Sequence, residues 1–289
     1  MEKIYPCLWL DNQAEEAARF YTSIFANGEI RETQYYLDDI HKPKGSVLTV
    51  EFSIANQRFL LLNVNGGDDF KITPAISFFV DCETKEELDT LWHALLDGGF
   101  ALMPLQEYPF SDYFGWVQDQ YGVSWQLTLS KIPQRISPAL MFANENFGKA
   151  KTAMTQWTEL FPNSEVQLEI PEGDYLQQAL FTLNGGLFRV MDSPIAHEFG
   201  FTMGVSFCVD CRDQAEIDRL WDNITTDGHE WDCGWAEDQY GVSWQIQPNN
   251  WLKLVDTSNL ARAEAVTNEL YKMKKIDIAQ LEAVYNHFA

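Results

Sequence analysis

The sequence predicts an α+β protein of two tandem domains followed by a helical tail, and three observations lead to this prediction. The phrase Asp-Gln-Tyr-Gly-Val-Ser-Trp-Gln occupies residues 119–126 and returns letter for letter at 238–245. An identity of this length so far apart indicates internal duplication. An order of strand, helix and further strands recurs in both halves. Beyond Pro248 the apolar pattern becomes purely helical.

The composition is that of a folded protein with an acidic surface. The 289 residues suffice for two domains with separate cores, and 46% of them are hydrophobic. A formal net charge of -23 argues against a nucleic-acid partner, because phosphate binding needs clustered Lys and Arg. No stretch has the length and apolarity of a membrane span, and the first residues lack a secretion signal. The five cysteines show no disulfide-framework spacing, so we expect a cytoplasmic protein.

Two strand–helix–strands units are predicted in the first half. Asn12 with Glu15 matches a capping box at the start of one helix, and Thr84 with Glu87 matches one at the start of the other. Apolar residues recur at helical spacing after each cap. The expected strands lie at residues 4–10, 47–54, 59–64, 76–82, through Trp116 and at 123–129.

Residues 100–114 are the main difference between the two halves. Equivalent residues lie 129 positions apart at the strand that ends in Cys82, but 119 positions apart at the repeated octapeptide. The first half therefore holds about ten extra residues, rich in Pro and aromatic side chains. We expect an ordered loop here, either a lid over a pocket or an ordinary surface loop.

The predicted boundaries are 1–131 for the first domain, 136–250 for the second and 251–289 for a C-terminal helical extension. Asp277 with Gln280 is expected to cap the last helix of this extension. No counterpart of the extension follows the first half. We expect it to pack on the second domain or across a subunit contact, which would make the protein a homodimer.

Two features carry a resemblance to a known family. One is Gly-Trp-x-x-Asp-x-Tyr-Gly-Val-Ser-Trp-Gln, which starts at Gly115 and again at Gly234; the other is the segment 273–282. The chain resembles the PhnB-like branch of the glyoxalase/bleomycin-resistance (vicinal oxygen chelate) superfamily, many members of which are called 3-demethylubiquinone-9 3-methyltransferase-like. The resemblance implies two βαβββ modules per domain, whose sheets curl into a cup. Four modules would then form two cups, or one composite arrangement resembling a dimer of single-domain relatives.

The resemblance also implies where a divalent metal would bind, and this chain departs from that pattern. Metal-dependent relatives keep a Glu four residues after the Gly of the Asp-x-x-Gly turn, where this chain has Gln126 and Gln245. The other implied ligand positions fall on apolar residues or glycine: Ile4 and Ile136, Leu61 and Val190, Ala75 and Gly204. A shift of one residue would bring in Tyr5 or Ser137. We expect no metal site and no cofactor, with a divalent metal at a displaced site as the alternative.

Strand alternation predicts the lining of the cups if Gln126 and Gln245 face inward. Tryptophans would form the walls, and Asn63 and Asp192 are expected on the inward faces of their strands. The candidates for a ligand pocket are Ser124, Gln126, Trp116, Asn63, Ser243, Gln245, Trp235 and Asp192. Such a pocket suits a small polar or aromatic molecule. Alternatively, the Gln and Ser side chains only hold the sheet and turn together through hydrogen bonds.

Three functional hypotheses follow, and no catalytic residue is assigned. The first is a small-molecule-binding protein without the metal triad. The second is an enzyme: a metal-dependent lyase, dioxygenase or thiol transferase, or the methyltransferase that the family label suggests. A methyltransferase would usually need a Gly-rich strand-to-helix turn, and none is visible. The third is an interaction role, with the C-terminal helices as a dimerisation device. Cys208 and Cys211 match C-x-x-C, but their odd spacing on a strand places the two sulfurs on opposite faces.

Overall fold

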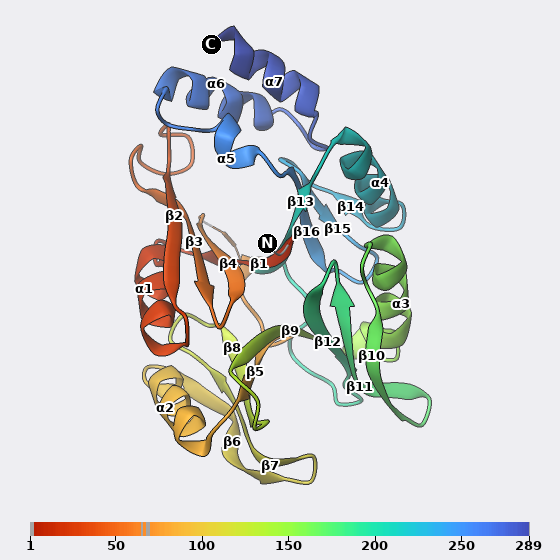
Figure 1. Ribbon diagram of the computed structural model, residues 1–289. Helices are drawn as coiled ribbons and strands as arrows, with labels where there is room; N and C mark the ends of the chain where they lie inside the picture. The colour runs from red at the N-terminus through yellow and green to blue at the C-terminus, as the bar shows by residue number, and fades with distance from the viewer. Residues whose placement is uncertain (1–2, 65, 68–69, 289) are drawn as a thin grey trace.

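Four βαβββ modules form the body of the protein, and a helical tail lies across one end (Figure 1). The computed structural model describes residues 3–64, 66–67 and 70–288. The predicted α+β class and the helical tail are both confirmed. Within the described residues, no helix combines the length and the apolar character needed to cross a membrane.

The modules repeat one order of elements. Module 1 holds β1 (Ile4–Leu10), α1 (Ala14–Ile24), β2 (Glu29–Tyr35), β3 (Val47–Ile54) and β4 (Gln57–Asn63). Module 2 holds β5 (Ile76–Cys82), α2 (Lys85–Leu96), β6 (Phe100–Tyr108), β7 (Ser111–Gln118) and β8 (Ser124–Leu129). Module 3 holds β9 (Arg135–Phe142), the short 3-10 helix η2 (Asn144–Asn146), α3 (Ala150–Leu160), β10 (Val166–Glu172), β11 (Tyr175–Leu183) and β12 (Gly186–Asp192). Module 4 holds β13 (Val205–Cys211), α4 (Gln214–Thr225), β14 (His229–Glu230), β15 (Trp235–Glu237) and β16 (Ser243–Pro248). The tail holds α5 (Trp251–Leu254), α6 (Leu260–Leu270) and α7 (Ile278–His287).

The two sheets each combine one module from each half of the chain. Sheet A has the order β14-β15-β16-β13-β1-β4-β3-β2, so it joins modules 1 and 4. Sheet B has the order β10-β11-β12-β9-β5-β8-β7-β6, so it joins modules 2 and 3. The junctions are antiparallel pairs, β1 with β13 and β5 with β9. Of the two arrangements that the sequence allowed, the composite one is present.

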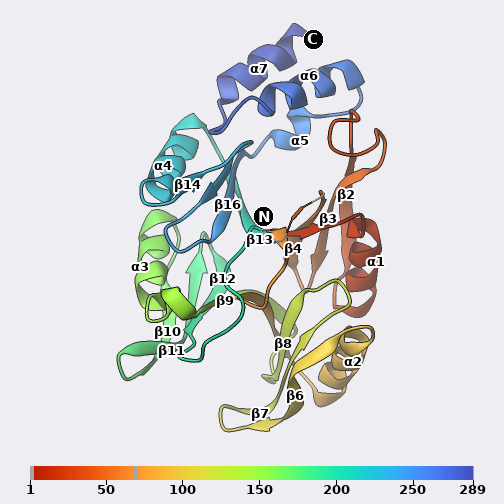
Figure 2. The same ribbon diagram turned by 180° about the vertical axis from the view of Figure 1, so that it is seen from behind.

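The helices cover the outer faces of both sheets. Helices α1 and α2 lie along one side of the molecule and α3 and α4 along the other, while the tail lies at the sheet A end in both views (Figure 1, Figure 2). One continuous apolar core includes side chains from all four modules and the tail. The face of each sheet that turns away from these helices is its cup; we name them cup A and cup B.

The repeated octapeptide links the two modules of each half. Asp119 begins its first copy, and its Oδ1 accepts hydrogen bonds from the backbone N–H groups of Tyr121 (2.9 Å) and Val123 (3.0 Å). Its Oδ2 accepts from the Trp125 indole N–H and from the Tyr21 hydroxyl, both at 2.8 Å. Because Tyr21 belongs to α1, this carboxylate fixes the turn of module 2 against the helix of module 1.

Asp238 makes the same four contacts in the second half. Its Oδ1 accepts from the N–H groups of Tyr240 and Val242. Its Oδ2 accepts from the indole N–H of Trp244 at 3.1 Å and from that of Trp157, on α3, at 3.0 Å. The glycine that ends each turn has a positive φ, as this tight turn requires. In both copies of the octapeptide, one buried carboxylate therefore holds the turn, the following strand and a helix of the preceding module together.

Two local expectations are wrong. Asn12 does not cap α1: the N-cap is Gln13, whose side chain makes no capping bond, and the helix N-terminus is satisfied by Asn63 Oδ1, which accepts from Ala14 N–H at 3.0 Å. The extra residues of the first half do not form a loop. They extend the antiparallel pair β6–β7 into a long hairpin. β6 is an edge strand of sheet B and is mostly exposed, so it lacks the alternation of apolar residues by which a half-buried strand is recognised, which explains the second error.

Replacing Asp119 or Asp238 by Asn should destabilise the fold. The NH₂ group of the Asn side chain would face hydrogen-bond donors where the Asp oxygen accepts from them. We therefore expect a loss of about 2–4 kcal/mol in the free energy of unfolding. Urea denaturation measures it. Asp112→Asn is the matched control, because that side chain is 85% exposed and should change stability by less than about 0.5 kcal/mol.

The size of this loss should depend on pH. Burial raises the pKa of Asp119 and Asp238 to about 6, although the accepted hydrogen bonds oppose the shift. A folded pKa above the unfolded one means that the folded state takes up a proton first as the pH falls, so the stabilisation is present at low pH and lost as the pH rises through 6. The penalty of Asp119→Asn should be about 2 kcal/mol larger at pH 4.5 than at pH 7.5. A penalty that shrinks on acidification would contradict the raised pKa.

Candidate functional site

Cup A holds a cavity of about 710 Å³ that is walled by three parts of the chain. Module 1 and module 4 provide its sides, and the tail provides its roof. Its aromatic lining comprises Tyr5, Trp9, Tyr35, Tyr36, His41, Trp235, Trp251 and Tyr271. Trp9 and Trp235 lie against each other with ring centroids 5.3 Å apart, so one wall joins side chains from both halves.

Strand alternation explains which side chains reach the cavity. On β1, Ile4 and Leu8 pack in the core between sheet and helices, whereas Tyr5 and Cys7 lie on the opposite face. The same alternation separates the two cysteines of the C-x-x-C match: Cys208 joins Tyr5 and Cys7 on the cup side, and Cys211 lies in the core. The expected placement of these sulfurs on opposite faces is confirmed.

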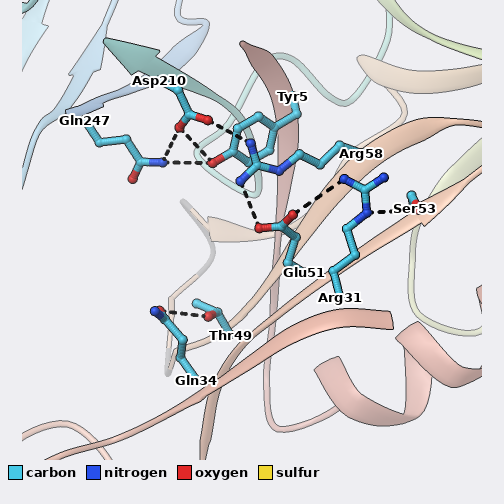
Figure 3. A network of polar contacts seen from close by, with 9 residues as sticks. All are labelled: Tyr5, Arg31, Gln34, Thr49, Glu51, Ser53, Arg58, Asp210 and Gln247. Carbon is cyan, nitrogen blue, oxygen red and sulfur yellow. Dashed lines mark hydrogen bonds and ion pairs between the residues drawn. The ribbon is translucent and has the colours of Figure 1, made fainter. Parts of the chain in front are cut away.

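Arg58 lies on the floor of cup A, between Tyr5, Glu51 and Asp210 (Figure 3). Arg58 Nη1 donates to Asp210 Oδ2 at 2.7 Å, and Arg58 Nη2 donates to Glu51 Oε2 at 2.8 Å. Its guanidinium carbon lies 3.6 Å from the centroid of the Tyr5 ring. Tyr5 and Gln247 each donate to Asp210 Oδ1, at 3.2 and 3.1 Å, and Gln247 also donates to the Tyr5 hydroxyl. The network spans β1, β3 and β4 of module 1 and β13 and β16 of module 4.

Tyr5 and Arg58 each keep one protonation state around neutral pH. Burial, followed by the nearby Cys208 and Asp210, raises the pKa of Tyr5 far above its ordinary value. Burial alone would lower the pKa of Arg58, but the hydrogen bond to Glu51 and the charge of Asp210 outweigh it and raise the pKa. Tyr5 is therefore a neutral phenol and Arg58 a permanent cation. This floor can orient a polar group, but it does not supply a proton acceptor at Tyr5.

Three candidate residues of the second half, Trp235, Ser243 and Gln245, lie together on module 4 in sheet A. Gln245 Nε2 donates to Ser206 Oγ at 2.9 Å, which holds its amide against the floor. Gln245 and Trp235 both line the cavity. Ser243 is fully buried two residues earlier on the same strand, and its Oγ has no hydrogen-bond partner among the residues that the structure describes.

Cup B repeats the design with different residues. Gln126 Nε2 donates to Ser77 Oγ at 2.8 Å, and the Trp116 indole N–H donates to Ser124 Oγ at 2.8 Å. The floor again carries an ion pair between halves, from Arg189 Nη2 to Asp81 Oδ2 at 3.1 Å. The Arg189 guanidinium covers the ring of Phe79 at 4.0 Å. In both cups the Gln side chain donates a hydrogen bond to a Ser of the neighbouring strand, as expected if these residues only hold the sheet together. Contact between these side chains and a ligand stays a prediction.

The expected inward orientation of Asn63 and Asp192 is wrong. Both lie on the helix side of their strands, at the N-termini of α1 and α3. Asn63 accepts from Ala14 N–H, and Asp192 Oδ1 accepts from the N–H groups of Gly148 and Ala150. The two strands alternate with Leu61 and Val190 in the core, and residues two positions further share that face.

The sequence reasoning missed the charged floor. Arg58 precedes an apolar run, and a lone charged residue beside a turn carries no distinctive signal. Asp81 and Asp210 were detectable, because they occupy equivalent positions 129 residues apart in the repeat. Their arginine partners sit at non-equivalent positions: Arg189 corresponds to Leu60 by sheet register, two residues from Arg58. A search for matched pairs across the repeat would have found only the carboxylates.

The residues of cup A do not fit a divalent metal. The ligand positions first implied for sheet A, Ile4 and Leu61, are core residues, as are Ile136 and Val190 in sheet B. Tyr5, reached by a shift of one, lies beneath the Arg58 guanidinium, whose positive charge opposes a cation there. Across the described residues, no three His, Cys, Asp or Glu side chains gather closely enough to hold a metal ion.

Removing Arg58 should destabilise the protein strongly. Arg58→Met leaves Asp210 and Glu51, whose side chains are 19% and 10% exposed, without their cation. We expect a loss of about 3–5 kcal/mol in the free energy of unfolding, measured by urea denaturation. Arg31→Met is the control, since that more exposed arginine lies 4.0 Å from Glu51 and should contribute less than about 1 kcal/mol. Equal effects of the two variants would refute a special role for Arg58.

Comparison with known proteins gives a family and a fold. The family model described as 3-demethylubiquinone-9 3-methyltransferase matches residues 2–128 and again 134–247. No curated protein matches the chain. A PhnB protein of known structure from Bacillus cereus is 44% identical, over 45% of this chain and 100% of that chain, with a TM-score of 0.42. Glyoxalase I from Zea mays is 10% identical, over 86% of this chain and 93% of that chain, with a TM-score of 0.59. At that identity the likeness concerns the fold alone, and it confirms the expected glyoxalase-like fold.

Proposed function

The chain belongs to the 3-demethylubiquinone-9 3-methyltransferase family, and we propose that it binds a small molecule with an aromatic or apolar body and a polar group in cup A. The observation that carries this proposal is the cavity of about 710 Å³ beneath the tail. Ligand pockets for small molecules have volumes of roughly 300–1,000 Å³, with apolar walls and a few placed polar groups.

The walls of the cavity are suited to the apolar body of the ligand, and the floor is suited to its polar group. Trp9 and Trp235 offer flat apolar surface on one side, and Trp251 adds another ring from the tail. Gln245 and Gln247 provide amide groups on the floor beside the buried ion pair of Arg58. An aromatic body would pack against the indoles while its polar group meets the amides. The cavity thus supports the small polar or aromatic ligand expected from the sequence.

The two cups provide a matched test, because Trp235 and Trp116 occupy equivalent positions. The protein would be titrated with small aromatic acids, phenols, quinones and amides, and binding followed by its tryptophan fluorescence. We expect at least one compound to bind at micromolar concentration. Trp235→Ala should weaken this binding by about 10- to 30-fold, the range for loss of a central aromatic contact. Trp116→Ala should leave it within about twofold.

Two results would overturn the proposal. One is that no compound of the panel binds, and the other is that Trp116→Ala weakens binding as much as Trp235→Ala does. Calorimetry on both variants excludes the simpler explanation that a fluorescent reporter has been lost, because it measures the heat of binding directly.

Binding should not require a metal. We expect purified protein to contain less than about 0.1 divalent metal per chain by elemental analysis, because the donor set of cup A suits no such ion. Gln245→Ala should leave this content unchanged. A stoichiometric metal that is lost on Gln245→Ala would instead favour the metal-dependent lyase, dioxygenase or thiol transferase considered from the sequence.

A further inference from the structure

The roof of cup A has two sides that are anchored to different modules. One side is the loop between β2 and β3, residues 36–46. It is tied to module 1, since Lys42 Nζ donates to Asp11 Oδ1 at 2.9 Å and to Asn12 Oδ1 at 2.6 Å. The Tyr36 hydroxyl also donates to the Asn63 carbonyl at 2.5 Å. This side moves with module 1.

The other side is the tail, which is tied to module 4. The N–H groups of Cys233 and Gly234 donate to the carbonyls of Met273 and Lys274, both at 2.7 Å. The Gln214 amide bonds the segment before α7 twice, through Nε2 to the Ile276 carbonyl and through Oε1 from Ile278 N–H. These bonds fix the end of α6 and the start of α7 to the second half of the chain.

The two sides meet in contacts that are weak by comparison. Lys44 of the loop forms an ion pair with Glu264 of α6, and their side chains are 49% and 34% exposed. His41 packs edge-on against Tyr271 with ring centroids 5.4 Å apart. Among the described residues, these are the polar and ring contacts recorded between the tail and module 1. Exposed ion pairs add little to stability, so this line can separate at low cost.

We propose that this line, which we name the cup A seam (His41, Lys44, Glu264 and Tyr271), is the entrance to the cavity and that α5 and α6 act as its lid. His41 and Tyr271 line the cavity directly, so parting them opens the roof. The hydrogen bonds between residues 273–278 and module 4 would stay intact while α5 and α6 move away from the β2–β3 loop. The ligand of the proposed function would enter here, but the lid itself is testable without any ligand.

The chain carries its own reporter of opening. Cys233 lines the cavity, and its Sγ lies 3.8 Å from the Leu270 carbonyl at the end of α6. Burial raises the pKa of this thiol to about 11, so alkylation is slow and sensitive to access. Cys82 and Cys211 are buried in the sheet–helix core and react only when the protein unfolds. Iodoacetamide, which is uncharged, therefore distinguishes opening of the lid from unfolding.

The experiment reverses the charges of the seam in the full chain. Lys44→Glu and Glu264→Lys each replace an attraction by a repulsion, and the rate of Cys233 alkylation at pH 8.5, followed by mass spectrometry, should rise about two- to fivefold. The double variant restores an ion pair in the opposite sense and should return to the wild-type rate. Lys151→Glu is the control: it breaks an ion pair with Glu169 on module 3, with the same change in net charge, and should leave the rate unchanged.

Three outcomes would overturn the lid. The single variants could react at the wild-type rate, the double variant could stay as fast as the single ones, or Cys82 and Cys211 could accelerate together with Cys233. Each would mean that the seam does not control access to the cavity. A failed ligand titration with a passed alkylation test would reject the proposed function and leave the lid in place, so the two proposals fail separately.

Discussion

The architecture depends on two buried carboxylates, those of Asp119 and Asp238. Desolvating a carboxylate costs several kcal/mol, and that cost is offset only when well-placed donors satisfy both oxygens. Here two donors are backbone groups of a turn, a third is the indole of the following strand, and the fourth comes from the helix of the preceding module. The arrangement is satisfied in one relative placement of the modules. The contact thus fixes how the two modules of each half are placed relative to each other.

The floors of the two cups follow from the pairing of strands between the two halves. Because β1 meets β13 and β5 meets β9, each floor is crossed by the boundary between the halves, and an Arg–Asp pair bridges it. A buried ion pair is sensitive to the loss of either partner, so the join tolerates little displacement. The cavity of cup A therefore exists only where the two halves of the chain pair. Neither half contains its walls alone, and the tail closes it from above.

Much of the fold was predictable from the sequence, because duplication and periodicity are local or repeated signals. The octapeptide placed the turns, and alternation around Gln126 and Gln245 placed Trp116 and Trp235 correctly on the cup faces. Asn63 and Asp192 were misplaced because their strands were counted from implied ligand positions that lie in the core. The pairing of Arg58 with Asp210 was missed because the two residues are 152 positions apart and meet only through sheet pairing between halves. Long-range pairing leaves no pattern in a single sequence, whereas helix faces and turns do.

The exchange of modules between halves has a consequence for how the two cups can change. In a symmetric dimer of single-domain chains, each substitution appears in both cups at once, so a cup cannot specialise without its twin. The fused chain removes that constraint, because each position of the repeat is encoded separately in the two halves. Tyr5 is equivalent to Ser137, and Leu60 is equivalent to Arg189, yet the residues of each pair differ. One cup can acquire a roof and a tailored lining while the other keeps the molecule together. The two cups of this chain accordingly differ in their floors, with Arg58 over Tyr5 in one and Arg189 over Phe79 in the other.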